Sequence, residues 1–171
     1  ISGFRGTVGG APEENLTSID IVKFASAYGS WIKTQDHGQL VIVGRDARLS
    51  GKMVSDLVCA TLTGMGLDVM DLGLSTTPTV EMAVKLEAAA GGIILTASHN
   101  PKQWNALKML NHLGEFISAK EAEHILQITE AQAFEYAEVT ALGQYQTNSQ
   151  YIQKHIDTIL ALPLVDVAAI R

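Results

Sequence analysis

Apolar positions along the chain alternate between a helical period and short continuous runs. After Thr17, a candidate N-cap, apolar residues recur at helical spacing from Ile21 to Ile32, which predicts an amphipathic helix. The unbroken apolar run at 40–43 comes next and predicts a buried strand. A helix with one apolar face followed by such a strand is typical of a helix that covers a sheet.

The same alternation continues through the middle of the chain. It predicts a helix at 50–65, a strand at 67–72, a helix from Pro78 to about residue 90 and a strand that begins at Ile93. Residues 105–110 alternate as a strand does, and the turn at 111–114 suggests that this strand is antiparallel to the others. A capping-box pattern, Ser118 with Glu121, then opens another helix.

Four strands that alternate with helices predict an α/β fold: a three-layer α/β/α sandwich with a mixed four-stranded sheet and one antiparallel strand. We place this domain at residues 1–135. Residues 134–147 have no clear period and are the candidate linker, whereas 148–160 predict one more helix, which Pro163 ends. Residues 136–171 are therefore expected to form a linker and a helix outside the domain.

Composition places the chain among globular proteins. Of its 171 residues, 47% are hydrophobic and 18% are charged, and apolar clusters recur from end to end. The longest apolar runs are too short to cross a bilayer, so we expect no membrane partner. The net charge of −6 argues against a nucleic-acid partner, because neutralising phosphates requires clustered Lys and Arg.

Cys59 is the single cysteine of the chain. It falls among the apolar positions of the helix at 50–65, so we expect a core residue rather than part of a disulfide or a thiolate metal site. A reducing, cytoplasmic setting fits this single thiol.

The strand that begins at Ile93 runs into a cluster of small, hydroxylated and imidazole side chains, residues 96–101. Ligands of open α/β sheets bind at the carboxyl ends of the strands. Ser98, placed there beside His99, is therefore a candidate nucleophile or phosphoryl carrier. The alternative is that Ser98 and Asn100 only satisfy the backbone of a turn.

Several cations fall in loops that we expect at the same edge. Arg5 is the one charge in the glycine-rich stretch 2–10, which predicts a loop, and two arginines follow the strand at 40–43. The candidate site contains one hydroxyl, one imidazole and four cations: Ser98, His99, Arg5, Arg45, Arg48 and Lys108. Cations without a matching cluster of carboxylates suit a phosphate ester better than a pair of catalytic acids.

Three motifs follow one another along residues 1–135: Ser2 to Gly6, Gly44 to Gly51, and Thr96 to Pro101 with the run at 104–108. Together they resemble the first domain of the α-D-phosphohexomutases, the superfamily of phosphoglucomutases, phosphomannomutases and phosphoglucosamine mutases. The second and third motifs in combination are far more specific than either alone.

This resemblance implies an isomerase, an intramolecular phosphotransferase in which Ser98 carries the phosphoryl group. Phosphate would move between O1 and O6 of a mannose, glucose or glucosamine phosphate through a hexose 1,6-bisphosphate. Lys108 would act as a base or phosphate contact, and Arg5 would support the transferring phosphate. His99 would hydrogen-bond in the site.

The same resemblance assigns the remaining motif residues a supporting role. Arg45, Asp46, Arg48 and Asn100 would organise the loop of Ser98 or bind phosphate. A Mg²⁺ cofactor would touch the phosphate on Ser98, while its protein ligands would come from an Asp-rich loop of a second domain, a motif that this sequence lacks.

Because later family motifs are also missing, the resemblance implies that the chain is a fragment whose partners are the remaining domains of a parent chain. Residues 148–171 would lead into the second domain, and the start at Ile1 rather than Met suggests that a segment precedes it. Alone, the chain is expected to be catalytically silent.

Alternatives remain for several of these residues. Lys108 could be a solvated residue of an edge strand, and Arg45 with Asp46 could form a plain structural ion pair. At the level of function, the alternative is a noncatalytic phosphate-binding or interaction domain of the same fold. A serine hydrolase is disfavoured, because no Gly-x-Ser-x-Gly elbow surrounds Ser98 and no acid is evident to orient His99.

Overall fold

A computed structural model describes residues 3–170, so Ile1, Ser2 and Arg171 lie outside it. Its strands are β1 Gly3–Thr7, β2 Leu40–Arg45, β3 Asp68–Leu74, β4 Gly91–Leu95, β5 Trp104–Leu110 and β6 Tyr145–Thr147. Its helices are α1 Ser18–Lys33, α2 Gly51–Gly64, α3 Thr77–Leu86, α4 Ala119–Ala131 and α5 Tyr151–Leu160, with short 3-10 turns η1 Val139–Ala141 and η2 Val167–Ala169.

The strands form one six-stranded sheet in the order β1-β5-β4-β2-β3-β6. Strand β2 is parallel to β3 and β4, and β3 is parallel to β6. Strand β5 is antiparallel to both of its neighbours, β1 and β4. The mixed α/β sheet is confirmed, with β5 the one reversed strand among residues 3–170, but the predicted count of four strands is wrong.

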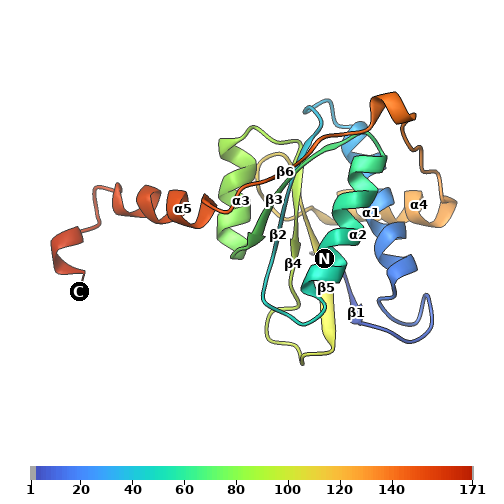
Figure 1. Cartoon of the computed structure of the whole chain (residues 1–171), viewed down its shortest axis with the longest axis horizontal. Coiled ribbons are helices and arrows are strands. Elements are labelled where there is room, and N and C mark those ends of the chain that lie inside the picture. The colour runs from blue at the N-terminus through green and yellow to red at the C-terminus, as the bar shows by residue number, and fades with distance from the viewer. Residues whose placement is uncertain (1–2, 171) are drawn as a thin grey trace.

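Helices cover the sheet on both faces (Figure 1), and alternate residues of one strand pack in two different hydrophobic cores. Val41 and Val43 of β2 pack in a core with buried residues of α1, α2 and α4. Ile42, between them, packs in a second core with Val80 and other residues of α3. A sheet buried on both faces explains why its inner strands are continuous apolar runs.

Strand β1 lies where the sequence predicts a loop. Gly3 has a φ of 133°, and a Cβ built on it would lie 1.9 Å from the main-chain oxygen of Leu107 in β5. Glycine therefore lets the two strands approach closely. Phe4 fixes β1 to the helical layer by stacking on Phe24 of α1, with ring centroids 3.7 Å apart.

Strand β6 lies in the stretch expected to be a linker, and it forms the opposite edge of the sheet. All three of its residues are exposed, so no apolar alternation marks it. Its structure comes from pairing with β3, where Tyr145 stands opposite Val69. The division of the chain at residue 135 stays a prediction.

The N-caps predicted at Thr17 and Ser118 are both confirmed. The Thr17 side chain accepts a hydrogen bond from the main-chain N–H of Asp20, whose carboxylate in turn accepts one from Thr17 N at 2.9 Å. Ser118 and Glu121 form the same capping box at α4. These boxes satisfy N–H groups that a helix start leaves without partners.

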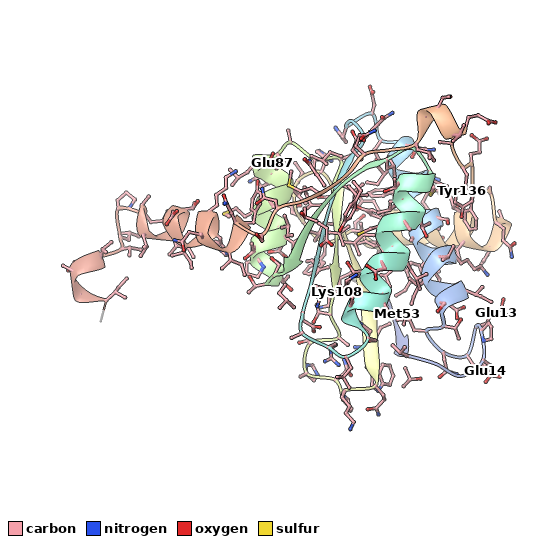
Figure 2. All side chains as sticks on the ribbon, viewed as in Figure 1. Glu13, Glu14, Met53, Glu87, Lys108 and Tyr136 are labelled. Carbon is pink, nitrogen blue, oxygen red and sulfur yellow. The ribbon has the colours of Figure 1, made fainter. Side chains whose placement is uncertain are left out.

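Helix α5 contacts α3 and points away from the rest of the domain (Figure 1). Tyr151 is 1% exposed and its hydroxyl contacts Glu87, which Figure 2 labels at the end of α3 next to α5. Lys154 Nζ lies 3.2 Å from Glu87 Oε1. Among the helices of residues 3–170, none has the length and hydropathy of a membrane-spanning segment.

Candidate functional site

The loops that follow β2 and β4 meet at one edge of the sheet. These two strands are parallel neighbours, and their last residues, Arg45 and Leu95, stand opposite each other. Because β5 is antiparallel to β4, its first residue, Trp104, starts at this same edge. The topology thus gathers the second and third sequence motifs around the Ser98 loop.

A cavity of about 530 Å³ opens beside this loop. Five of the predicted site residues line it: Arg5, Ser98, His99, Asn100 and Lys108. The remaining lining residues are Gly3, Thr96, Ala97 and Ala106. The other three predicted residues, Arg45, Asp46 and Arg48, are not part of this lining.

Ser98 is an exposed residue on this cavity. Its backbone has a φ of 53°, in the left-handed region that residues with a Cβ seldom adopt. Such conformations persist only where neighbouring contacts hold them, and they concentrate at functional sites. Some of the contacts that hold this loop come from the loop after β2.

Arg48 uses its whole guanidinium group on this loop. Its Nη atoms donate to four main-chain oxygens, those of Ser98 at 2.6 Å, Asn100 at 2.9 Å, Pro101 at 2.9 Å and Trp104 at 3.0 Å. Its Nε donates to Asp46 Oδ2 at 3.1 Å. A guanidinium has five N–H donors, and these contacts account for all five.

Asp46 is the ion-pair partner of Arg48 and not of Arg45. Its Oδ1 also accepts from the main-chain N–H of Arg48 at 3.0 Å. Among the side-chain hydrogen bonds of the described residues, the Arg45 guanidinium makes only one, to the main-chain oxygen of Asp46 at 3.2 Å. The alternative of an Arg45–Asp46 ion pair is therefore wrong, because the carboxylate faces away to the Ser98 loop.

Arg5 and Lys108 bring two positive charges to the cavity. Gly3 stands opposite Lys108 and Arg5 is two residues further along β1, so both cations lie on one face of the sheet. Strand β5 lies inside the sheet between β1 and β4, so Lys108, which Figure 2 labels, is not an edge-strand residue. Neither cation has an ion-pair partner among residues 3–170.

Aromatic rings lie beneath both cations. The guanidinium of Arg5 is 5.9 Å from the ring centroid of Trp104, and Lys108 Nζ is 5.7 Å from that of Phe116. Such contacts attract a cation without neutralising it, so the charges remain available to an anion. Sequence reasoning missed both aromatic contacts, because neither pair has a sequence spacing that marks it.

Asn100 stabilises the turn by hydrogen bonds, whereas His99 lines the cavity. The Asn100 side chain donates to the main-chain oxygen of Ala97 at 2.7 Å, and its main-chain N–H donates to the same oxygen at 3.0 Å. His99 is exposed and lines the cavity beside Ser98. The loop thus presents a hydroxyl and an imidazole to one space.

The described residues do not form a magnesium site by themselves. Nowhere between residues 3 and 170 do three His, Cys, Asp or Glu side chains gather as metal ligands. The carboxylate beside the loop, Asp46, is already bonded to Arg48 and to the Thr96 hydroxyl. Mg²⁺ prefers six oxygen ligands, so a phosphate on Ser98 would supply only part of its shell.

Comparison with known proteins identifies the family and the fold of this domain. The family model described as phosphoglucomutase/phosphomannomutase, alpha/beta/alpha domain I, matches residues 1–136. The chain belongs to this family. Its domain I fold is shared by the crystal structure of a phosphoglucomutase/phosphomannomutase family protein from Burkholderia thailandensis, with a TM-score of 0.78 and 25% identity over 93% of this chain and 34% of that one.

Curated relatives of this domain I are mutases. The chain is 32% identical to the phosphoglucomutase/phosphomannomutase of Thermococcus kodakarensis over 169 residues, 97% of this chain and 36% of that relative. It is 38% identical to the phosphoglucosamine mutase of Natranaerobius thermophilus over 118 residues, 69% of this chain and 26% of that relative. The chain spans about a third of the length of such relatives.

Proposed function

We propose that this chain is the phosphoserine domain of a phosphohexomutase, an isomerase that moves phosphate between O1 and O6 of a hexose phosphate. The observation that carries the proposal is the place of Ser98. This exposed residue has a left-handed backbone and lines a cavity that Arg5 and Lys108 also line. The mutase names of the relatives support the same reaction.

In the proposed reaction, phosphorylated Ser98 gives its phosphoryl group to a free hydroxyl of the bound sugar phosphate. The bond from Ser98 Oγ to phosphorus breaks, and a bond from the sugar oxygen to phosphorus forms. The proton of the sugar hydroxyl leaves to a base, Lys108 or His99, and Ser98 Oγ gains a proton. The product is a hexose 1,6-bisphosphate.

The bisphosphate then turns around, and Ser98 takes back the other phosphoryl group by the reverse steps. The protein contributes mainly position and charge, as phosphoryl transfer requires. Arg5 stabilises the negative charge that spreads over the phosphoryl oxygens, and Lys108 does the same if His99 rather than Lys108 is the base. Neither is neutralised by a carboxylate within the described chain.

Mg²⁺ would neutralise phosphate charge when bound. Since the residues that the structure describes offer no full set of ligands, the remaining ones would come from other domains of a longer protein. We therefore expect the 171-residue chain alone to show no mutase turnover. A protein that carries this chain as its first third, called the full-length enzyme below, would be active.

Turnover of glucose, mannose and glucosamine 1-phosphates by the full-length enzyme tests the proposal. Ser98→Ala should abolish turnover of whichever sugar reacts, while Ser149→Ala, at an exposed serine of the C-terminal segment, should leave it unchanged. Turnover that survives Ser98→Ala would contradict the proposal. If no sugar reacts but phosphate still binds, the noncatalytic phosphate-binding domain is the better interpretation.

A further inference from the structure

Thr96 links the strand end to the loop in a way that the reaction above does not use. It is 9% exposed, and its hydroxyl accepts the main-chain N–H of Ser98 at 3.0 Å. The same hydroxyl donates to Asp46 Oδ2 at 2.6 Å. A threonine hydroxyl has one donor and two acceptor sites, so both contacts are satisfied together.

These contacts close a ring of hydrogen bonds around the backbone of Ser98. From Ser98 N–H the ring passes to Thr96 Oγ1, from there to Asp46 Oδ2, and from Asp46 to Arg48 Nε. It returns from Arg48 Nη2 to the main-chain oxygen of Ser98. Both polar backbone groups of Ser98 are therefore held, one on each side of its Cα.

The ring explains how Ser98 remains at a φ of 53°. A left-handed backbone costs a residue with a Cβ about 1–2 kcal/mol, which other contacts must offset. Two ring members, the Asp46 carboxylate and the Arg48 guanidinium, are charged, and hydrogen bonds to charged groups are the strong ones. The same side chains that hold the loop thus keep the serine in its unusual conformation.

The ring also separates two kinds of arginine at the site. Arg48 has no N–H left for a phosphate, because all five donors are engaged within the protein. Arg5 lines the cavity, and Arg48 does not. Phosphate recognition therefore falls to the cavity cations, and Arg48 acts through Ser98.

We infer that Thr96, with Asp46 and Arg48, is a positioning residue that aims the Ser98 hydroxyl for phosphoryl transfer. The ring itself stands on the geometry alone, whereas its catalytic consequence rests on the function proposed above. A matched pair of variants separates the effect of the Thr96 hydroxyl from the effect of the side-chain shape. Thr96→Val removes the hydroxyl and keeps the shape of the side chain, and Thr96→Ser keeps the hydroxyl.

The first readout is amide hydrogen exchange by NMR in the 171-residue chain. Thr96→Val should speed exchange of the Ser98 N–H by about tenfold or more, the factor expected for losing a hydrogen bond within a charged network. Exchange at Ile93, inside β4, should stay unchanged, and Thr96→Ser should match the parent. If the Ser98 N–H of Thr96→Val exchanges at the unchanged rate while the sheet is intact, the hydrogen bond from Ser98 to Thr96 does not hold this backbone.

The second readout is the rate at which glucose 1,6-bisphosphate phosphorylates Ser98 in the full-length enzyme. Thr96→Val should slow it by about 10- to 100-fold, the size of effect that a small misplacement of a reacting group produces. Thr96→Ser should restore the rate. Wild-type speed in Thr96→Val would overturn the positioning role. If the full-length enzyme without substitutions does not become phosphorylated, the proposed function is contradicted. The hydrogen-exchange result would still show whether Thr96 holds the Ser98 N–H.

Discussion

The Nη2 atom of Arg48 lies 2.6 Å from the main-chain oxygen of Ser98, although fifty positions separate the two residues. This contact joins the loop after β2 to the loop after β4. Three further main-chain oxygens accept hydrogen bonds from the same guanidinium, so one side chain bridges the loop from Ser98 to Trp104. The geometry of the candidate phosphoserine thus depends on a residue that does not touch the cavity.

Arg48→Lys tests that dependence. Lysine keeps the charge but has three donors in place of a planar fork, so it cannot serve four carbonyls and Asp46 together. We expect kcat of the full-length enzyme to fall by about 10- to 100-fold with a smaller change in KM. Lys52→Arg, on the exposed side of α2, is the control. A higher KM with unchanged kcat would instead place Arg48 on the substrate.

Lys108→Met should weaken catalysis for a different reason, because it removes a charge from the cavity itself. Methionine keeps the apolar stem of the side chain but loses the cation–π contact with Phe116. Loss of one such charge is expected to lower kcat/KM by about 100-fold or more. Steady-state kinetics of Lys102→Met, at an exposed lysine of the loop that precedes β5, provide the comparison. Equal effects of the two substitutions would exclude a local role for Lys108.

Sequence patterns predicted the inner strands because their burial on both faces leaves continuous apolar runs, as in β2 and β4. The edge strands could not be read in this way. Strand β1 depends on the close approach of Gly3 to Leu107, and exposed β6 depends on pairing with β3. Both are specified by partners far away in the sequence.

For the candidate site, too, some features could be predicted from the sequence and others depend on residues far away in it. The strand-end loops and their charges could be predicted, since parallel strands bring their carboxyl ends to one edge. The role of Thr96 could not be predicted, because its partner Asp46 is distant in sequence and a threonine two residues before a serine is not a distinctive pattern. The left-handed backbone of Ser98 was also beyond prediction, because only the assembled loop holds it.

Asp20 links the stability of the domain to pH. Burial alone would raise the pKa of this carboxyl, but hydrogen bonds from Thr17 and from the main chain of Glu13 outweigh it and hold the pKa below its usual value. A lowered pKa means that the folded state favours the carboxylate. Its stabilising contribution is complete above the usual pKa, about pH 4, and is lost as pH falls through the lowered value.

Asp20→Asn should therefore lower the free energy of unfolding by about 1 kcal/mol at pH 7, as expected for a weakened helix cap. The gap between parent and variant should shrink as the pH drops below about 4. Urea unfolding from pH 7 to pH 2 measures it, with Asp56→Asn at an exposed ion pair as the control. A gap that does not change with pH would contradict the account of Asp20.

Cys59 should be nearly inert in the folded chain. Burial is the main cause that raises the pKa of its thiol to about 12, and the residue is 5% exposed. Only the thiolate reacts with disulfide reagents, so labelling at pH 8 should be at least about 100-fold slower than in urea. Reaction of the folded chain at the unfolded rate would mean that α2 does not pack as described.

A phosphopeptide map of the full-length enzyme, before and after addition of a hexose 6-phosphate with Mg²⁺, tests directly whether Ser98 carries the transferred phosphate. We expect phosphate on the peptide that contains Ser98, and loss of that phosphate when the sugar is added. If Ser98 carries no phosphate even after treatment with a hexose 1,6-bisphosphate, the phosphoserine mechanism is contradicted.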